Sequence, residues 1–140
     1  MYSYQYPRPA YTADTIIFCK DEILLIRRGN EPYKDMWALP GGFVNEGETS
    51  AEAAVRELQE ETGVNIGVDT IHLVGIYDTI GRDPRGWTIS AAYAVSIDSK
   101  PMVGGYDDAA EAMWFSIKNL PELAFDHKKI ISDAIASVGL

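Results

Sequence analysis

Short apolar segments separated by turn residues dominate the hydrophobic pattern of the chain. Five segments rich in β-branched and aromatic residues predict β-strands at residues 15–19, 23–28, 71–77, 88–97 and 112–117. Asp21 and Glu22 interrupt the first two segments, so we expect a hairpin turn there.

Between Thr49 and Gly63 the apolar residues have the spacing of an α-helix. Thr49 and Glu52 have the spacing of a capping box, in which the hydroxyl and the carboxylate each satisfy a free backbone donor. Gly63 supplies the stop, because a residue without a Cβ easily adopts the left-handed conformation after the last turn. At about 100° per residue, one stripe is expected to face the core: Ala51, Ala54, Val55, Leu58 and Thr62.

A second helix is predicted from His127 to about Val138, with Asp126 as its N-cap. Its apolar face is expected to consist of Ile130, Ile131, Ala134 and Ile135. Together, the strands and helices predict an α/β protein in which a mixed β-sheet lies between helices. We expect one domain over residues 1–140, because the chain has no internal repeat or low-complexity linker.

Three glutamates of the first helix indicate a possible chemistry. Glu57, Glu60 and Glu61 stand at i, i+3 and i+4, so they project from one face and their oxygens can converge. Oxygen ligands suit magnesium, which is commonly shared between one or two carboxylates and the phosphates of a substrate. The alternative is a solvated acidic face, which is the usual environment of charged side chains. A metal site would make a phosphate ester or anhydride the natural substrate.

The sequence around these glutamates forms a longer motif. From Gly42 to Val64 it follows the pattern G-x5-E-x7-R-E-U-x-E-E-x-G-U, where U is an apolar residue. This pattern resembles the Nudix box of the Nudix hydrolases, and a motif that spans a loop, a helix and its stop is specific. The resemblance implies the α/β/α Nudix sandwich and hydrolysis of a nucleoside diphosphate linked to another moiety.

The resemblance also implies roles for individual residues. It assigns magnesium or manganese binding to Glu57, Glu60 and Glu61, orientation of a glutamate to Arg56, and support of the loop and helix to Glu48. The strings YPRPA, GRDPRGW and LAFDH further resemble a subgroup that includes ADP-ribose pyrophosphatases and the Nudix domains of regulators of NAD metabolism. ADP-ribose is therefore the leading substrate, with AMP and ribose 5-phosphate as products.

Two other functions stay open at this point. The chain could be a housekeeping hydrolase of modified nucleoside triphosphates, or a non-catalytic sensor of NAD-derived ligands. The motif is intact and no DNA-binding segment is expected after the second helix, so we favour catalysis over sensing.

The loop at residues 78–87 is expected to contact the substrate. Arg82 and Arg85 could clamp a diphosphate through forked hydrogen bonds, although an exposed turn with paired charges is an equal alternative. Trp87 is the preferred residue for stacking on adenine. The full set of expected substrate contacts is Arg82, Arg85, Trp87, Gly41, Gly42 and Asp126.

A carboxylate outside the motif is expected to act as the general base. The candidates are Asp107, Asp108 and Glu111, and their alternative is a solvated acidic turn after two glycines. His72 and His127 are expected to be structural.

The composition of the chain limits the classes of molecule that it is expected to bind. A net charge of −9 argues against a nucleic-acid surface, which needs clustered Lys and Arg. The single cysteine, Cys19, is expected in the core. With no signal peptide or long apolar span, we expect a cytoplasmic protein with a small-molecule nucleotide substrate and no membrane partner. The tyrosine-rich stretch at residues 1–14 is expected to pack against a second subunit of a homodimer.

Overall fold

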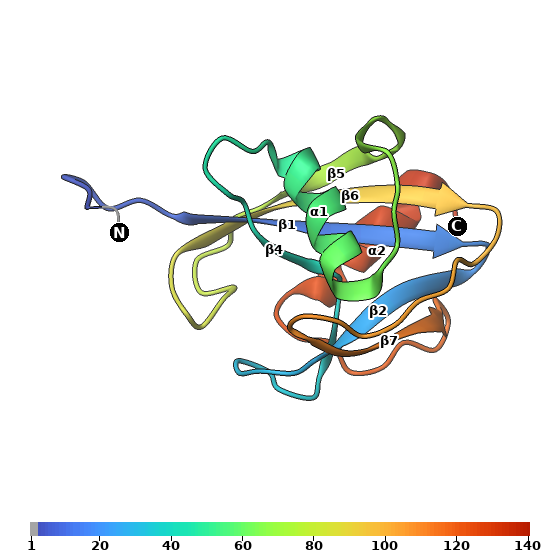
Figure 1. Cartoon of the computed structure of the whole chain (residues 1–140). Helices are drawn as coiled ribbons and strands as arrows, with labels where there is room; N and C mark the ends of the chain where they lie inside the picture. Colours follow the sequence, from blue (N-terminus) through green and yellow to red (C-terminus); the bar gives the residue numbers. More distant parts are fainter. Residues whose placement is uncertain (1–2) are drawn as a thin grey trace.

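The computed structural model describes residues 3–140, in which a β-sheet lies between two helices (Figure 1). The elements in chain order are β1 (Ala10–Cys19), β2 (Glu22–Arg28), β3 (Trp37–Ala38), β4 (Gly41–Phe43), α1 (Ser50–Thr62), a 3₁₀ turn (Val68–Thr70), β5 (His72–Tyr77), β6 (Thr88–Ile97), β7 (Ala109–Ser116) and α2 (His127–Val138). The predicted α/β sandwich is confirmed.

β1 occupies the centre of the sheet. The strand order is β3-β2-β1-β6-β5, with β4 paired to β1 and β7 paired to β2. β1 runs parallel to β6 along its whole length, from Ala10 opposite Thr88 to Cys19 opposite Ile97. The other pairings are antiparallel, so the predicted mixed sheet is also confirmed.

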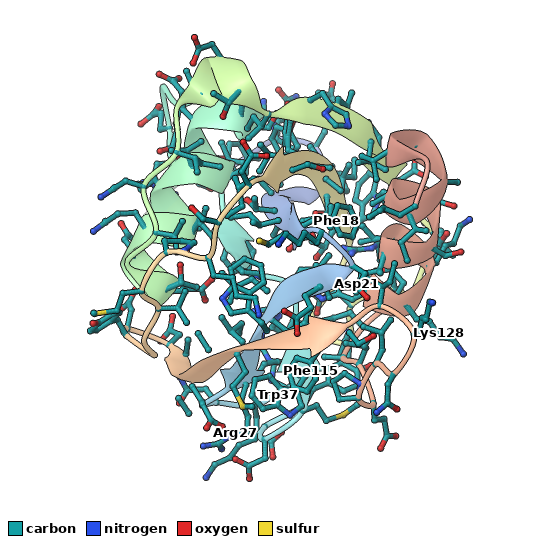
Figure 2. The ribbon with its side chains drawn as sticks, turned by 90° about the vertical axis from the view of Figure 1, so that its right-hand side faces the viewer. Phe18, Asp21, Arg27, Trp37, Phe115 and Lys128 are labelled. Atoms are coloured by element: carbon teal, nitrogen blue, oxygen red, sulfur yellow. The ribbon has the colours of Figure 1, made fainter. Side chains whose placement is uncertain are left out.

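The two helices cover opposite faces of this sheet (Figure 2). Successive side chains of a strand point to opposite faces, and β1 follows this rule. Ile16 and Phe18 pack in one apolar cluster with Ile130 of α2. Ile17 packs in another cluster with Leu58 of α1. β1 therefore holds both helices in place through alternate residues.

α1 begins and ends as predicted. Thr49 and Glu52 form the reciprocal hydrogen bonds of a capping box, and Gly63 ends the helix in the left-handed conformation. The buried residues are Ala53, Ala54, Leu58, Glu61 and Thr62. The prediction that Ala51 and Val55 belong to the buried stripe is wrong, since both are only partly buried. The helix is turned so that a carboxylate lies inside the protein.

Several boundaries differ from the prediction because they depend on pairing partners. β3 and β4 were not predicted, since segments of two or three residues carry no period. β1 begins at Ala10 because β6 extends it. β7 begins at Ala109, so Glu111 lies within a strand and not in an acidic turn. α2 starts at His127 as predicted, but the side chain of Asp126 forms no capping hydrogen bond.

Other expectations concern the surface and the core. Cys19 is 4% exposed, which confirms its place in the core. Among residues 3–140, no helix has the length and apolar character needed to cross a membrane. In the stretch expected to contact a second subunit, Met1 and Tyr2 lie outside the described residues, whereas Tyr4 and Tyr6 are exposed. Residues 3–9 extend away from the sheet (Figure 1).

We expect Thr49→Ala to lower the free energy of unfolding by about 1 kcal/mol, because a free backbone donor of α1 loses its acceptor. Urea denaturation followed by circular dichroism measures the change. Gln59→Ala, on the exposed side of the same helix, is the matched control and should be nearly neutral. Equal stability of the two variants would contradict the role of the capping box.

Candidate active site

The candidate site begins where β4 passes between β1 and α1. Gly41 lies opposite Asp14 in the sheet, and a Cβ on Gly41 would be 2.3 Å from Oδ1 of Asp14. A Cβ on Gly42 would be 2.6 Å from Oε1 of Glu57. Such distances are far below van der Waals contact. At Gly41 the close atoms include the backbone of Ala13 and Asp14, so only glycine fits there, whereas at Gly42 the carboxylate of Glu57 would have to move. The loop before α1 is therefore pressed against the acidic face of the helix.

The three glutamates of the motif have different environments. Glu61 is 5% exposed, and its carboxylate accepts a hydrogen bond of 2.8 Å from the backbone N–H of Gly41. Glu57 and Glu61 line the same cavity, which has a volume of about 320 Å³. Glu60 is more exposed and is not among the residues that line this cavity. The structure thus brings two of the three carboxylates together.

Arg56 connects the acidic residues of the motif. Its guanidinium donates two hydrogen bonds to Glu48, at 2.7 and 3.0 Å. One terminal nitrogen, Nη1, also donates to Glu57 at 2.8 Å and to Glu60 at 3.2 Å. The hydrogen bonds from Arg56 hold the pKa of Glu48 below its usual range. Arg56 therefore ties the loop before α1 to the helix and brings Glu57 and Glu60 to one guanidinium nitrogen.

Burial disfavours the charged forms of the two cavity glutamates. Burial raises the pKa of Glu61 to about 8, although the hydrogen bond from Gly41 acts in the opposite direction. Burial also raises the pKa of Glu57, despite its hydrogen bond from Arg56. Bringing a cation to these carboxylates would stabilise their ionised forms.

The donor set can be tested for its fit to a divalent cation. In this conformation, no cluster of three or more Asp, Glu, His or Cys side chains within residues 3–140 is arranged to hold a metal ion. The expected convergence of all three glutamates is absent within these residues, and Nη1 of Arg56 binds both Glu57 and Glu60. Two carboxylates completed by substrate phosphates and waters still match what magnesium requires. Glu57 and Glu61 therefore fit such an ion, and Glu60 would have to leave Arg56 to join them.

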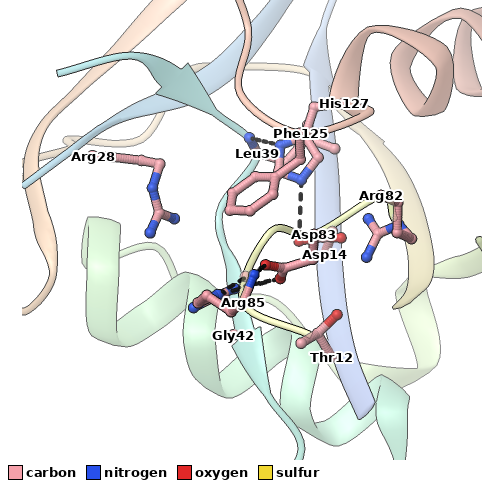
Figure 3. A pocket seen from close by; sticks show the side chains of 11 residues that line it. Thr12, Asp14, Arg28, Leu39, Gly42, Arg82, Asp83, Arg85, Phe125 and His127 are labelled. Carbon is pink, nitrogen blue, oxygen red and sulfur yellow. Dashed lines mark hydrogen bonds and ion pairs between the residues drawn. The ribbon is translucent and has the colours of Figure 1, made fainter. Parts of the chain in front are cut away.

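Arginine side chains form the basic part of the cavity. Arg28, at the end of β2, and Arg85 line it together with the two glutamates. Nε of Arg28 donates to the carbonyl of Pro32 at 2.6 Å, and Arg28 forms no ion pair with a carboxylate of residues 3–140. Figure 3 shows its guanidinium beside the pocket, without a bond to the other residues drawn. Arg28 is thus a cation with donors to spare.

Arg28 was not predicted from the sequence. Burial lowers its pKa, and the nearby charge of Arg85 lowers it further. An anion bound beside Arg28 would raise its pKa and so oppose the effects of burial and of Arg85. The only sequence signal was the pair of arginines at the end of an apolar strand. Charged residues are also common where a buried strand ends at the protein surface, so this signal was not specific.

A smaller polar pocket (Figure 3) shares Arg28, Gly41, Gly42 and Arg85 with the cavity. Asp14 is 6% exposed and accepts a hydrogen bond from Ser90. His127 accepts one through Nδ1 from the backbone N–H of Leu39 at 3.0 Å, and its Nε2 is 3.9 Å from Asp14. Burial lowers the pKa of His127, so the ring is neutral near pH 7 and supports the loop before β4. The sequence signal that could have identified Asp14 was an acidic residue next to an apolar strand segment.

Two residues predicted separately as substrate contacts bind each other. The guanidinium of Arg82 donates two hydrogen bonds to Asp126, at 2.9 and 2.7 Å. The side chain of Arg82 is 4% exposed and that of Asp126 is 22% exposed. The planar fork of Arg82 is therefore occupied. The pair joins the loop before β6 to the start of α2.

Arg85 and Trp87 continue the same loop. Arg85 pairs with the buried Asp83 at 2.7 Å, and its guanidinium carbon lies 5.1 Å from the ring centre of Phe43. Trp87 is half exposed, but it is not among the residues that line the two pockets, whereas Phe43 lines the larger one. The structure thus places Arg85 in the cavity and Trp87 outside it.

The three candidate bases are also separated. Asp108 lines the cavity with Glu57 and Glu61. Glu111 lies in β7 and forms an ion pair of 3.4 Å with Arg27. Asp107 is exposed and does not line the cavity. Of the predicted candidates, only Asp108 lines the cavity with the glutamates, within residues 3–140.

A cavity lined by carboxylates and arginines suits a phosphorylated compound bound together with a cation. Residues 8–134 match the NUDIX domain family. The chain therefore belongs to this family and is a Nudix hydrolase.

Three relatives show how far the similarity extends. The chain is 49% identical over 128 residues to the ADP-ribose pyrophosphatase of Methanocaldococcus jannaschii, covering 91% of this chain and 74% of that protein. It is 34% identical to the ADPR responsive transcriptional repressor NtrR of Acinetobacter baylyi, covering 94% of this chain and 55% of that protein. A bifunctional NMN adenylyltransferase/ADP ribose pyrophosphatase from Francisella tularensis, solved with AMP and a manganese ion, superposes with a TM-score of 0.86 at 32% identity, over 96% of this chain and 43% of that one.

We expect Arg82→Lys and Asp126→Asn each to lower the free energy of unfolding by about 1.5–3 kcal/mol, because a charge-assisted, forked pair is lost in a buried place. Urea denaturation measures this change in the free energy of unfolding. Arg27→Lys, the same change at an exposed ion pair, is the control and should cost less than about 1 kcal/mol. If Arg82→Lys were as stable as Arg27→Lys, the pair would not be a structural tie.

We expect Glu61→Gln to stabilise the metal-free protein at alkaline pH. With its pKa raised from 4.5 to about 8, Glu61 contributes stability below pH 4.5 that is lost as the pH rises through 8. In chelator, the variant should therefore exceed the wild type by on the order of 2 kcal/mol at pH 8.5 and match it at pH 4.5. Glu122→Gln, at an exposed site, should show no such pH dependence. A less stable Glu61→Gln protein at pH 8.5 would contradict this assignment.

Proposed function

We propose that this chain hydrolyses the diphosphate linkage of ADP-ribose to AMP and ribose 5-phosphate, with magnesium or manganese. The observation that carries the proposal is the composition of one cavity, which is lined by Glu57, Glu61 and Asp108 together with Arg28 and Arg85. A diphosphate carries negative charge that the arginines can bind and that a cation on the glutamates can neutralise. The relative with 49% identity is named an ADP-ribose pyrophosphatase, which supports this substrate.

Each group in the cavity has a part in the proposed reaction. A divalent cation held by Glu57 and Glu61, and by Glu60 once it is released from Arg56, would neutralise the diphosphate and acidify a water molecule. Arg28 directs its unpaired donors to a phosphate oxygen, because a guanidinium binds phosphate through charge-assisted hydrogen bonds. These contacts position the diphosphate for in-line attack.

The surroundings keep these groups in place. Gly41 and Gly42 let the substrate approach the backbone closely, since neither has a side chain above the cavity. The hydrogen bonds from Arg56 fix the loop before α1, and the neutral His127 holds Leu39 at the start of that loop. Asp108 lines the same cavity, and in the proposed reaction it accepts the proton of the attacking water.

Substrate assays with magnesium test the proposal. We expect wild-type protein to release AMP from ADP-ribose faster than it acts on nucleoside triphosphates, and to lose activity in chelator. Glu57→Gln and Glu61→Gln should each lower kcat/KM for ADP-ribose by about 10²- to 10³-fold, because charge at the cation site is lost. Glu122→Gln is the matched control, at an exposed site away from the cavity, and should behave as wild type.

The products separate the alternatives. Pyrophosphate and a nucleoside monophosphate, formed from a triphosphate in preference to AMP from ADP-ribose, would identify a triphosphate hydrolase. Binding of ADP-ribose by calorimetry without any product would identify a sensor; the relative from Acinetobacter baylyi is named an ADPR responsive transcriptional repressor. Full activity of both Gln variants in chelator would contradict the cation-dependent mechanism.

A cytoplasmic location, a homodimer and the absence of a nucleic-acid partner stay predictions. Light scattering on the purified protein measures the dimer, and Tyr4 and Tyr6 are the exposed residues where we expect contact between subunits.

A further inference from the structure

Residues 104–108 form a strap that joins the last turn of α1 to the start of β7. The backbone N–H of Gly104 donates to the carbonyl of Thr62 at 3.2 Å, and that of Tyr106 donates to the carbonyl of Glu61 at 3.0 Å. Carbonyls in the last turn of a helix have no donor within the helix. The strap is therefore bonded directly to the end of the helix that carries the acidic site.

The ring of Tyr106 anchors the strap at this end. A Cβ on Gly63 would lie 3.3 Å from Cε2 of Tyr106, and a Cβ on Gly104 would lie 3.0 Å from its Cζ. The ring thus rests on the two glycines, and it is 57% exposed on its other side. Its hydroxyl forms no hydrogen bond within residues 3–140, so packing of the ring is what holds it.

The other end of the strap is bound to the loop after β2. The backbone N–H of Gly29 donates to the carbonyl of Asp108 at 3.1 Å. The side-chain amide of Asn30 donates to the carboxylate of Asp108 at 3.3 Å. Asp108 is thus held through both its backbone and its side chain.

The cavity lies between these two attachments. Asn30 and Asp108 both line it, as do Glu57 and Glu61. Asp107, the preceding residue, has a φ of 55°, a conformation that few residues other than glycine adopt easily. The strap is thus bent sharply at the position that directs the next residue toward the glutamates.

We propose that Tyr106 and Asn30 are positioning residues for Asp108, which accepts the proton of the attacking water. This inference rests on the proposed hydrolysis at the same site. The water oxygen bonds to phosphorus, and the bridging P–O bond breaks with its electron pair on the departing phosphate. The water proton passes to the carboxylate of Asp108. Tyr106 sets the position of that carboxylate, and the amide of Asn30 sets its orientation.

Steady-state kinetics with magnesium and ADP-ribose test the proposal. Asp108→Asn should lower kcat by about 10²- to 10⁴-fold. Tyr106→Ala and Asn30→Ala should each lower kcat by about 10- to 100-fold with little change in KM, because the base is displaced while the phosphate contacts persist. Tyr106→Phe keeps the ring and should restore wild-type kcat. Met102→Ala, in the same connection between β6 and β7 but before the strap, is the matched control, since Met102 is 94% exposed.

The double variant Asp108→Asn with Tyr106→Ala gives the sharpest result. If Tyr106 acts only through Asp108, the double variant should be no slower than Asp108→Asn alone. Losses that multiply would overturn the proposal, as would near-normal kcat in Asp108→Asn or Tyr106→Ala.

A measurement without substrate keeps this test separate from that of the proposed function. In Tyr106→Ala, amide hydrogen exchange at residues 104–109 should be faster than in the wild type, while α1 is unchanged. Unaltered exchange would overturn the positioning role. If ADP-ribose is not cleaved, the substrate proposal fails, and the same variants are compared on whichever nucleotide the wild type hydrolyses.

Discussion

The close approach of β4 to its two neighbours is the constraint on which the site depends. Asp14 of β1 lies against Gly41 on one side, and Glu57 of α1 lies against Gly42 on the other. A side chain at Gly41 would push the strand away from β1, and one at Gly42 would displace the carboxylate of Glu57. The same closeness lets the N–H of Gly41 reach Glu61. Two glycines thus set the distance between the sheet and the acidic helix.

This geometry places carboxylates where their charge is unfavourable. Burial raises the pKa of both Glu57 and Glu61, and only part of the missing positive charge comes from Arg56. Apolar clusters pack on both faces of the sheet and α1 is capped at both ends, so the rest of the fold offsets the cost of these carboxylates. Stability is therefore lower at the site than it would be with neutral groups, and a bound cation would remove that cost.

Local features of the sequence were predicted well. The capping box at Thr49 and the stop at Gly63 involve residues of one turn, so their geometry follows from the chain itself. The central strands were predicted because their β-branched residues fit the pleated surface of a sheet. Glu111 was misplaced because the start of β7 depends on its pairing with β2.

The sequence by itself determined the family, the acidic helix and its ends, because a motif of fixed spacing on one helix needs no distant partner. Only the tertiary structure decided which charges meet across the chain. Arg82 is bound by Asp126, forty-four residues away, and Asp108 faces Glu61 because the strap joins α1 to β7. Such pairs are set by strand order and loop path, which no local pattern of residues encodes.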